Sequence, residues 1–296
     1  MKCGRCPEKA VVELKYLGKR LCSKHFSELF EKRIGRTIAN SNMLDRKKDK
    51  IAVGVSGGKD SLVLLYLLKK FHYNVIAVTI DEGIEGYRDN SLSYIRRFCK
   101  KYKIPWKLYS LEREYGFTLD SISDRKCSYC GVLRRGMLNK KARALKCTKV
   151  ATGHNLDDEA QMILMNLFRG ELERIARSGP TAGLIEDELF VPRVKPLREC
   201  PEKEDLLYAV LHKIEYTDLE CPYASYAYRN TIREVLNRME EKYPGTKFAV
   251  LKNFDKMIPF LRKYYMPKEK PKRCRNCGEM ARGNICKFCE TIGKFE

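Results

Sequence analysis

A glycine-rich hexapeptide between an apolar run and an apolar helical run is the feature that most constrains this chain. Residues 56–61 read SGGKDS; they follow a predicted strand at 51–55 and lead into a predicted helix at 60–71. Glycine lets a backbone approach a ligand closely and adopt angles that other residues resist. The amide groups and the dipole at the start of a helix attract anions. The segment therefore predicts a phosphate-binding loop in an α/β fold.

The loop differs from the Walker motif of kinases and GTPases. That motif requires a glycine five residues before the glycine that precedes its lysine, and a serine or threonine directly after the lysine. Val53 and Asp60 occupy these positions. A Walker site is therefore excluded, and a glycine-rich turn without a ligand is the alternative to a phosphate loop.

Strands and helices alternate along the middle of the chain. Apolar runs predict further strands at residues 75–80, 106–110 and 149–152. Apolar and helical patterns predict helices at residues 26–44, 90–102, 131–145, 156–169, 202–213 and 229–242. This alternation predicts a doubly wound parallel sheet that is covered on both faces. The basic segment 259–273, which contains three prolines, is predicted to be a linker.

Basic residues outnumber acidic ones. The chain has 59 Lys and Arg against 38 Asp and Glu, for a net charge of +21. Such an excess attracts polyanions and favours nucleic acid as the partner; the alternative is a charge that only maintains solubility. The apolar runs are far shorter than the roughly 20 residues of a membrane span, and the N-terminal MKCGRC contains no apolar signal region. We therefore expect a cytoplasmic protein without a membrane partner.

Each end of the chain carries four potential metal ligands in two close pairs. This spacing favours a structural zinc ion with tetrahedral coordination; iron sites or disulfides are the alternatives. We expect an N-terminal finger at residues 1–30, a main domain at 31–267 and a C-terminal finger at 268–296. The ligands are Cys3, Cys6, Cys22 and His25 in the first finger, and Cys274, Cys277, Cys286 and Cys289 in the second.

Three other cysteines lie apart from the fingers. Cys127 and Cys130 form CSYC, and Cys221 follows far downstream in ECPY. Three thiolates suit a catalytic zinc site, an iron–sulfur site with one open iron, or a redox pair. The spacing alone does not choose among these.

A second candidate segment reads ATGHNLDDEAQ at residues 151–161. Gly153 ends a predicted strand, so its backbone is expected at the same sheet edge as the phosphate loop. Acidic residues then open a helix, where they are stabilised by its dipole. We favour Asp158 for binding Mg²⁺ or moving a proton; the alternative is that it only caps the helix. His154 is more simply explained as a structural residue.

The hexapeptide SGGKDS resembles the PP-loop of the N-type ATP pyrophosphatase family. That resemblance implies an adenine-nucleotide α-hydrolase-like fold, cleavage of ATP between its α- and β-phosphates, and adenylation of a substrate. It implies that Lys59 takes part in catalysis and that Arg134 contacts phosphate. The implied ATP site consists of Gly54, Val55, Ser56, Gly57, Gly58, Lys59, Asp60, Ser61, Ile80, Arg134 and Gly153.

Within this family, CSYC, GHNLDDEAQ, the ECPY cysteine and the two fingers are similar to the tRNA 2-thiolation branch, over nearly the whole chain. The resemblance implies that Cys127, Cys130 and Cys221 are catalytic and hold a 4Fe-4S cluster whose fourth iron lacks a cysteine. A persulfide on Cys127 or Cys221 is the second mechanism. The segments CGVLRR and MNLFRG resemble the wobble-uridine enzymes more than those acting on the T-loop.

The resemblance therefore implies a tRNA uridine 2-sulfurtransferase with ATP, magnesium, a 4Fe-4S cluster and two zinc ions. A homodimer is expected. Sulfide, a cysteine desulfurase and a ubiquitin-like thiocarboxylate carrier are the open sulfur donors. The alternative functions are thiolation of a T-loop uridine or a cytidine, and RNA binding by a zinc-finger protein without catalysis.

Overall fold

A parallel sheet with one antiparallel edge strand forms the centre of the computed structural model. The structure describes residues 1–182, 190–224, 228–265, 272–281 and 283–295. The sheet order is β5-β4-β3-β6-β8-β7, and of the strands described in this sheet only β7 runs antiparallel to its neighbour. The strands are β3 (Lys50–Gly54), β4 (Asn74–Asp81), β5 (Trp106–Ser110), β6 (Lys149–Thr152), β7 (Thr181–Ala182) and β8 (Arg193–Val194). The predicted doubly wound α/β fold is confirmed.

The strand order reverses beside β3. The chain continues from β3 to β4 and β5 on one side, then crosses to β6 and β8 on the other. Ligands of open α/β sheets bind at such a switch point, outside the carboxyl ends of the strands. The segments 56–61 and 151–161 begin at the carboxyl ends of β3 and β6, which are paired neighbours. The topology therefore brings the two predicted nucleotide segments together.

Side chains of the sheet alternate between two cores. Ile51 and Val53 lie in the core that contains α1 (Ser23–Asn40), α2 (Lys59–Lys70), α3 (Arg88–Lys101) and α8 (Glu202–Leu211). Ala52 and Val150 lie in the opposite core, beneath α5 (Lys126–Ala144). This period of two is what a strand buried on both faces requires.

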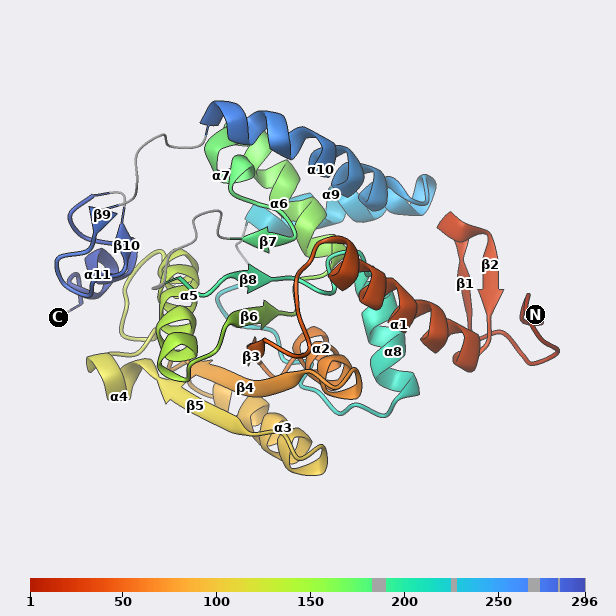
Figure 1. Ribbon diagram of the computed structural model, residues 1–296, viewed down its shortest axis with the longest axis horizontal. Helices are drawn as coiled ribbons and strands as arrows, with labels where there is room; N and C mark the ends of the chain where they lie inside the picture. Colours follow the sequence, from red (N-terminus) through yellow and green to blue (C-terminus); the bar gives the residue numbers. More distant parts are fainter. Residues whose placement is uncertain (183–189, 225–227, 266–271, 282, 296) are drawn as a thin grey trace.

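A further group of helices packs beyond β8. It comprises α6 (Leu156–Phe168), α7 (Leu172–Ala176), α9 (Tyr228–Lys242) and α10 (Thr246–Tyr265), and Figure 1 shows these helices gathered above the sheet. The short α4 (Leu111–Tyr115) follows β5. Within the described residues, no helix combines the length and the apolar character that a membrane span requires.

The prediction of a linker at 259–273 is wrong for residues 259–265 and for residues 272–273, which form a strand. Residues 259–265 continue α10, with Pro259 inside the helix. A proline in a helix interior costs about 3 kcal/mol. Burial of Leu251, Phe254 and Ile258 against α6 and α7 offsets this cost. Residues 266–271, which include the proposed boundary at 267/268, lie outside the described residues.

The helix predicted at 131–145 starts earlier than expected. α5 begins at Lys126, so CSYC forms its first turn instead of preceding it. Gly131 suggested a helix start, yet a Cβ there would lie 3.2 Å from Nη1 of Arg135. Gly131 therefore lies inside α5, with the guanidinium of Arg135 near it, and does not mark the start of the helix.

The two fingers lie at opposite ends of the long axis (Figure 1). The N-terminal finger contains β1 (Val12–Leu14), η1 (Lys15–Leu17) and β2 (Lys19–Leu21), and α1 leads directly from it into the main domain. The C-terminal finger contains β9 (Lys272–Arg273), β10 (Met280–Ala281) and α11 (Lys287–Ile292). Its Phe288 lies so close to Gly136 of α5 that a Cβ there would be 2.3 Å from the ring.

The close approach of β6 to α2 generates a testable prediction. A Cβ at Gly153 would lie 2.9 Å from the carbonyl carbon of Asp60 and from the amide nitrogen of Ser61. We expect Gly153→Ala to displace the start of α2, to destabilise the protein by about 1–3 kcal/mol and to weaken ATP binding. Thermal unfolding and calorimetric titration with ATP measure both effects.

Gly35→Ala is the matched control, because Gly35 lies in α1 and a Cβ there meets nothing within 4 Å. It should stabilise the protein by up to about 1 kcal/mol and leave ATP binding unchanged. Wild-type stability and ATP affinity in Gly153→Ala would contradict the tight packing at this edge.

Candidate functional site

The predicted phosphate loop folds around the hydroxyl of Ser61. The amide of Ser56 donates to Ser61 Oγ over 3.2 Å, and that hydroxyl donates to the carbonyl of Gly58 over 2.9 Å. Gly57 has a φ of +91°, and a Cβ there would lie 2.8 Å from Cβ of Ser91. Both the backbone angle and the lack of space therefore require glycine at this position.

Lys59 is held by carboxylates. Its Nζ lies 2.8 Å from Oε1 of Glu202, the first residue of α8, and 3.3 Å from Oδ2 of Asp60. Partial burial alone would lower the pKa of Lys59, but these two carboxylates raise it. The lysine is thus a cation beside the loop, as stabilisation of phosphate charge requires.

Asp60 faces a second carboxyl group, that of Asp205 on α8. Asp205 is fully buried, and neither of its oxygens meets a donor. Burial, with the charges of Asp158 and Glu202, raises the pKa of Asp60 to about 6, against the opposing charge of Lys59. Burial and the charge of Asp60 hold the pKa of Asp205 well above its ordinary value. A proton on Asp205 would let its carboxyl donate a hydrogen bond to the carboxylate of Asp60.

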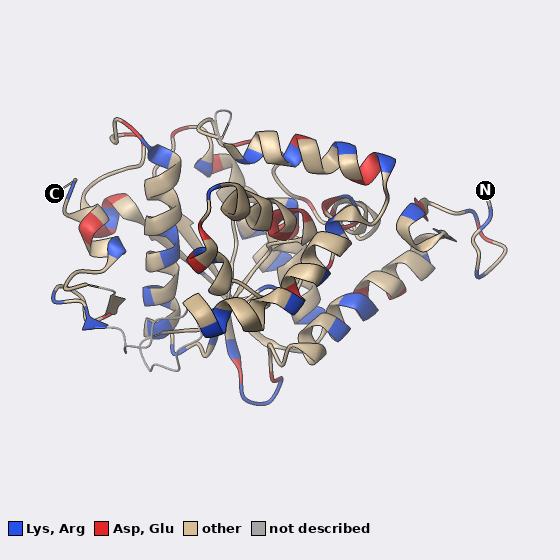
Figure 2. Ribbon diagram, turned by 90° about the horizontal axis from the view of Figure 1, so that it is seen from above, with Lys and Arg blue, Asp and Glu red and all other residues tan. Residues whose placement is uncertain are grey.

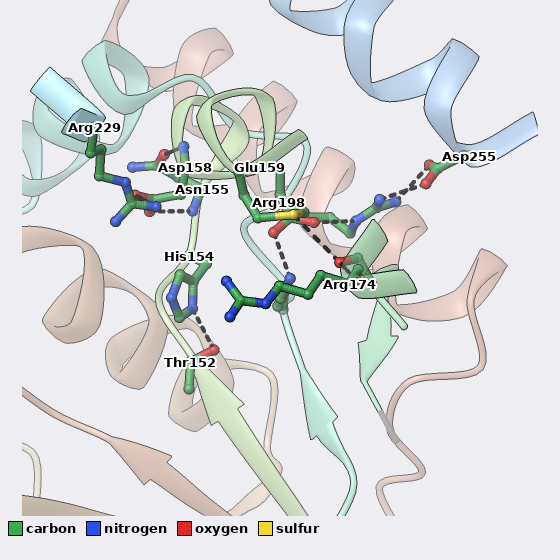
Figure 3. A network of polar contacts seen from close by, with 12 residues as sticks. Thr152, His154, Asn155, Asp158, Glu159, Arg174, Arg198, Arg229 and Asp255 are labelled. Carbon is green, nitrogen blue, oxygen red and sulfur yellow. Dashed lines mark hydrogen bonds and ion pairs between the residues drawn. The ribbon is translucent and has the colours of Figure 1, made fainter. Parts of the chain in front are cut away.

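Asp158 closes the start of α6. It accepts from the amide of Asn155 at 3.1 Å, while Asn155 Oδ1 accepts from the amide of Asp158 at 3.0 Å. Its other oxygen, Oδ1, lies 3.6 Å from Nη2 of Arg229 on α9 (Figure 3). The structure therefore contains the helix cap that was the alternative to a catalytic role for Asp158. Its Oδ1 lies outside the cap and faces Arg229.

His154 lies just below this cap. Its Nδ1 lies 2.8 Å from Oγ1 of Thr152, and the ring is exposed (Figure 3). Although the side chain reaches solvent, the protein packed around the ring, and then the charges of Lys195 and Arg193, lower the pKa of His154. The imidazole is therefore neutral near neutral pH.

Cys127, Cys130 and Cys221 lie in one neighbourhood. Cys127 and Cys130 lie one helical turn apart on α5. Cys221 lies close enough for a charge on its sulfur to act on both thiols. Cys127 donates to the carbonyl of Tyr223 over 2.9 Å, which ties the segment after Cys221 to the start of α5. The fold therefore brings together three cysteines that are distant in sequence.

The three sulfurs are not arranged around a single ion. Among the described residues, only the two terminal groups place three or more ligand atoms within 4.8 Å of one another. An iron–sulfur cube binds each cysteine at a different iron, so its ligands stand further apart than those of one ion. The donor type and the wide spacing fit such a cluster better than a third zinc site.

The terminal groups have the spacing of single-ion sites. Cys6 Sγ and Cys22 Sγ are 3.7 Å apart, and Cys277 Sγ and Cys286 Sγ are 3.6 Å apart. A tetrahedral zinc ion with Zn–S bonds of about 2.3 Å places its sulfurs about 3.8 Å apart. A disulfide needs about 2.05 Å. Both groups of four could therefore bind zinc, and the cysteines are not paired in disulfides.

The remaining predicted residues lie around the loop or support it. Gly54 and Val55 end β3 and begin the loop. The side chain of Ile80 is buried in the core beneath α5, so only its backbone is placed to contact a ligand. Arg134 lies 3.6 Å from Glu82, a buried residue directly after β4.

A chain of contacts connects the loop to the cysteines. Arg88 donates to the carbonyl of Ser56 over 3.2 Å and pairs with Glu82, which also pairs with Arg134. Arg134 in turn lies close enough to Cys130 and Cys221 for their charges to act on it. The candidate nucleotide and cysteine sites therefore adjoin each other.

Comparison with known proteins agrees with this arrangement. The PP-loop domain family matches residues 26–240, and the N-terminal LIM domain of the 2-thiouridine synthetase TtuA matches residues 2–27. The tRNA-5-methyluridine(54) 2-sulfurtransferase of Pyrococcus horikoshii is 39% identical, over 99% of this chain and 94% of the relative. The chain belongs to the PP-loop tRNA 2-thiolation family.

Other members of this PP-loop family are similar over comparable lengths. The cytoplasmic tRNA 2-thiolation protein 1 of Danio rerio is 35% identical, over 98% of this chain and 87% of the relative. The U34-tRNA thiolase NcsA of Methanococcus maripaludis, solved with its [4Fe-4S] cluster, superposes with a TM-score of 0.86 and 31% identity, over 99% of this chain and 96% of that one. The sequence identity to the methyluridine-54 enzyme is thus close to the identities to the other relatives, and it does not by itself choose between the two tRNA positions.

Sequence reasoning missed Glu202, Asp205 and Glu82. Glu202 and Asp205 follow Pro201 in a charged stretch that is indistinguishable from an ordinary helix start. Only the packing of α8 on α2 places them beside the PP-loop. The position of Glu82 after the predicted strand 75–80 was the one available signal.

The buried carboxyl pair predicts an unusual dependence of stability on pH. Because the folded-state pKa of both acids is raised, the native protein binds their protons more tightly than the unfolded chain. Stability should fall as pH rises from the unfolded pKa of Asp60, 3.8, through its folded value of about 6. Asp205→Asn removes one of the two charges and supplies an amide donor.

Asp205→Asn should therefore be more stable than the wild type at about pH 8, by on the order of 1–2 kcal/mol, with a smaller difference at about pH 5.5. Denaturant unfolding of both proteins at the two pH values measures this. Asp218→Asn, at an exposed acid, is the control and should show no such trend. A variant that is less stable than the wild type at high pH would show that Asp205 does not carry the shared proton.

Proposed function

We propose that this chain is a tRNA uridine 2-sulfurtransferase that adenylates the base with ATP and delivers sulfur through a 4Fe-4S cluster. The observation that carries the proposal is the junction of the PP-loop and the three cysteines through Arg88, Glu82 and Arg134. The site that adenylates a base and the site that delivers sulfur must lie next to each other if both act on the same base. The net charge of +21 supports an RNA substrate, and basic residues (blue) predominate over acidic ones (red) in Figure 2.

The first step activates the base. The C2 oxygen of uridine attacks the α-phosphorus of ATP, and pyrophosphate leaves. Lys59 and the loop amides stabilise the negative charge that develops on the phosphate. Glu202 competes for Lys59 before the nucleotide binds, so phosphate oxygens must replace that carboxylate. We place Mg²⁺ near Asp158, whose Oδ1 is not used by the helix cap and would leave Arg229 to bind the ion.

The second step replaces oxygen by sulfur. A sulfur nucleophile attacks C2, the C2–O bond breaks, and AMP leaves with the original oxygen of the base. Activation is needed because an amide-like oxygen is otherwise a poor leaving group. Cys127, Cys130 and Cys221 would hold the cluster, which when bound supplies an iron without a cysteine ligand for sulfur delivery. Arg134, next to Cys130, would contact a phosphate beside this site.

Several finer assignments are part of the proposal. We favour the wobble uridine as the acceptor, because CGVLRR and MNLFRG resemble the wobble enzymes. We also propose one zinc ion in each finger, a homodimer and a cytoplasmic location, the last supported by the naming of the Danio rerio relative. The sulfur donor is sulfide, a desulfurase product or a thiocarboxylate carrier. Persulfide transfer and thiolation of another base are the alternatives to the proposed mechanism and acceptor.

Two measurements on protein purified without oxygen test the proposal. Incubation with ATP and unmodified tRNA should form AMP and 2-thiouridine, and mass spectrometry locates the thionucleoside. Cys221→Ala should lose the brown iron–sulfur absorbance and the thiolation while it retains its zinc. Cys147→Ala, at an isolated buried cysteine, should retain all three.

The results separate the alternatives. Lack of AMP formation by the wild type would favour an RNA-binding protein without catalysis. Survival of colour and thiolation in Cys221→Ala would show that the trio does not hold the cluster. Thiolation without iron–sulfur absorbance in the wild type would favour the persulfide route.

A further inference from the structure

Arg193 is an arginine whose charged neighbours are other arginines. It lies at the start of β8, where it is partly buried, opposite Val150 of β6. Val194 points into the core of α2, so the alternation of the strand directs Arg193 to the face covered by α5. Its Nε meets no acceptor. Burial, with the charges of Arg135 and Arg134 on α5, lowers the pKa of Arg193 to about 10.

Other cations face the same space. Lys195, Arg193, Arg229 and Arg134 all act on the imidazole of His154. In Figure 3 the side chain of Arg174 extends toward His154, and Arg229 lies above it beside Asp158. Arg135 has Arg134 and Arg174 as its cationic neighbours.

The nearby acids are already engaged. Glu159 lies 2.6 Å from Lys195 and 3.7 Å from Arg198. Asp158 uses one oxygen in the helix cap and turns the other toward Arg229. Glu82 pairs with both Arg88 and Arg134. Within the described part of the chain, no carboxylate forms an ion pair with Arg135 or Arg193, and the charge of Arg135 acts on Arg193.

A group of arginines without a counter-ion destabilises the folded protein. Like charges that are partly removed from water repel each other, and the cost disappears when an anion binds between them. Ionisable groups with perturbed pKa values cluster at functional sites. Arginine side chains also offer the fork of N–H donors that suits phosphate oxygens. The chemistry of the missing partner is therefore that of a phosphate group.

We propose that Arg135 and Arg193, with His154 at their edge, form a phosphate-binding site distinct from the SGGKDS loop. The site lies on the α5 side of the sheet, and Arg135 has Cys130 as a further neighbour. A phosphate held there would lie on the face of the sheet that α5 covers, next to the helix that carries Cys127 and Cys130. If the proposed function holds, this is the place for an RNA backbone phosphate next to the acceptor base; the pyrophosphate released from ATP carries the same chemistry.

Binding measurements distinguish the two sources and require no turnover. The affinity for an unmodified tRNA transcript is measured over a series of salt concentrations without ATP, and the affinity for pyrophosphate by calorimetry. Arg135→Gln and Arg193→Gln are each expected to weaken tRNA binding about tenfold at ~0.1 M salt and to reduce the slope of log K against log salt by about 1. Arg193→Lys should keep the slope, because the charge remains.

Arg113→Gln is the control, because Arg113 is exposed on α4, outside the cation group. It should change neither affinity. Unfolding midpoints and zinc content show whether each variant is folded.

Each outcome decides the proposal. Loss of tRNA affinity with unchanged pyrophosphate binding assigns the site to RNA phosphate, and the reverse pattern assigns it to the leaving group. Both affinities unchanged in folded Arg135→Gln and Arg193→Gln would overturn the site. Because these affinities are measured without catalysis, they stand even if the wild type forms no AMP, which is the result that would overturn the proposed function instead.

Discussion

A buried carboxylate, Glu82, holds the two halves of the functional region together. It is fully buried directly after β4 and pairs with Arg88 of α3 and Arg134 of α5. Arg88 supports the PP-loop through the carbonyl of Ser56, and Arg134 stands next to Cys130. Removing one partner of a buried ion pair costs about 3–5 kcal/mol. One carboxylate at the end of a central strand therefore fixes both the loop and the helix that carries two of the cysteines.

The N-terminal finger supports the same region from the other side. Tyr16 of the finger donates to Glu204 of α8 over 2.6 Å, and Arg33 of α1 binds the same carboxylate at 2.8 Å. Glu202, half a turn earlier on α8, holds Lys59. The finger thus positions the helix that supplies the acidic partner of the PP-loop lysine. A structural role for this finger, expected from its four ligands, extends to the geometry of the nucleotide site.

Local sequence signals predicted those parts of the fold that depend on neighbours in the chain. The apolar strands, the glycine loop and the cysteine pairs follow from period and spacing, so the sheet and both fingers could be anticipated. The prediction at Pro259 is wrong because the packing of α10 on α6 and α7 keeps the helix continuous, and the prediction at Gly131 is wrong because α5 already begins at Lys126. The partners of Lys59 and Asp60 come from α8, 143 residues or more along the chain, and no periodicity reports such a contact.

The C-terminal finger lies against the helix that begins with the cysteine pair. Phe295 stacks edge-on against Tyr129, between Cys127 and Cys130, with ring centroids 5.2 Å apart, and Glu279 pairs with Arg143 near the other end of α5. During synthesis on a ribosome, the PP-loop domain emerges before this finger. The first turn of α5 consequently lacks the contact between Tyr129 and Phe295 until the C-terminal finger has folded against it. Completion of the packing around the first turn of α5 would then be one of the last events in the folding of the protein.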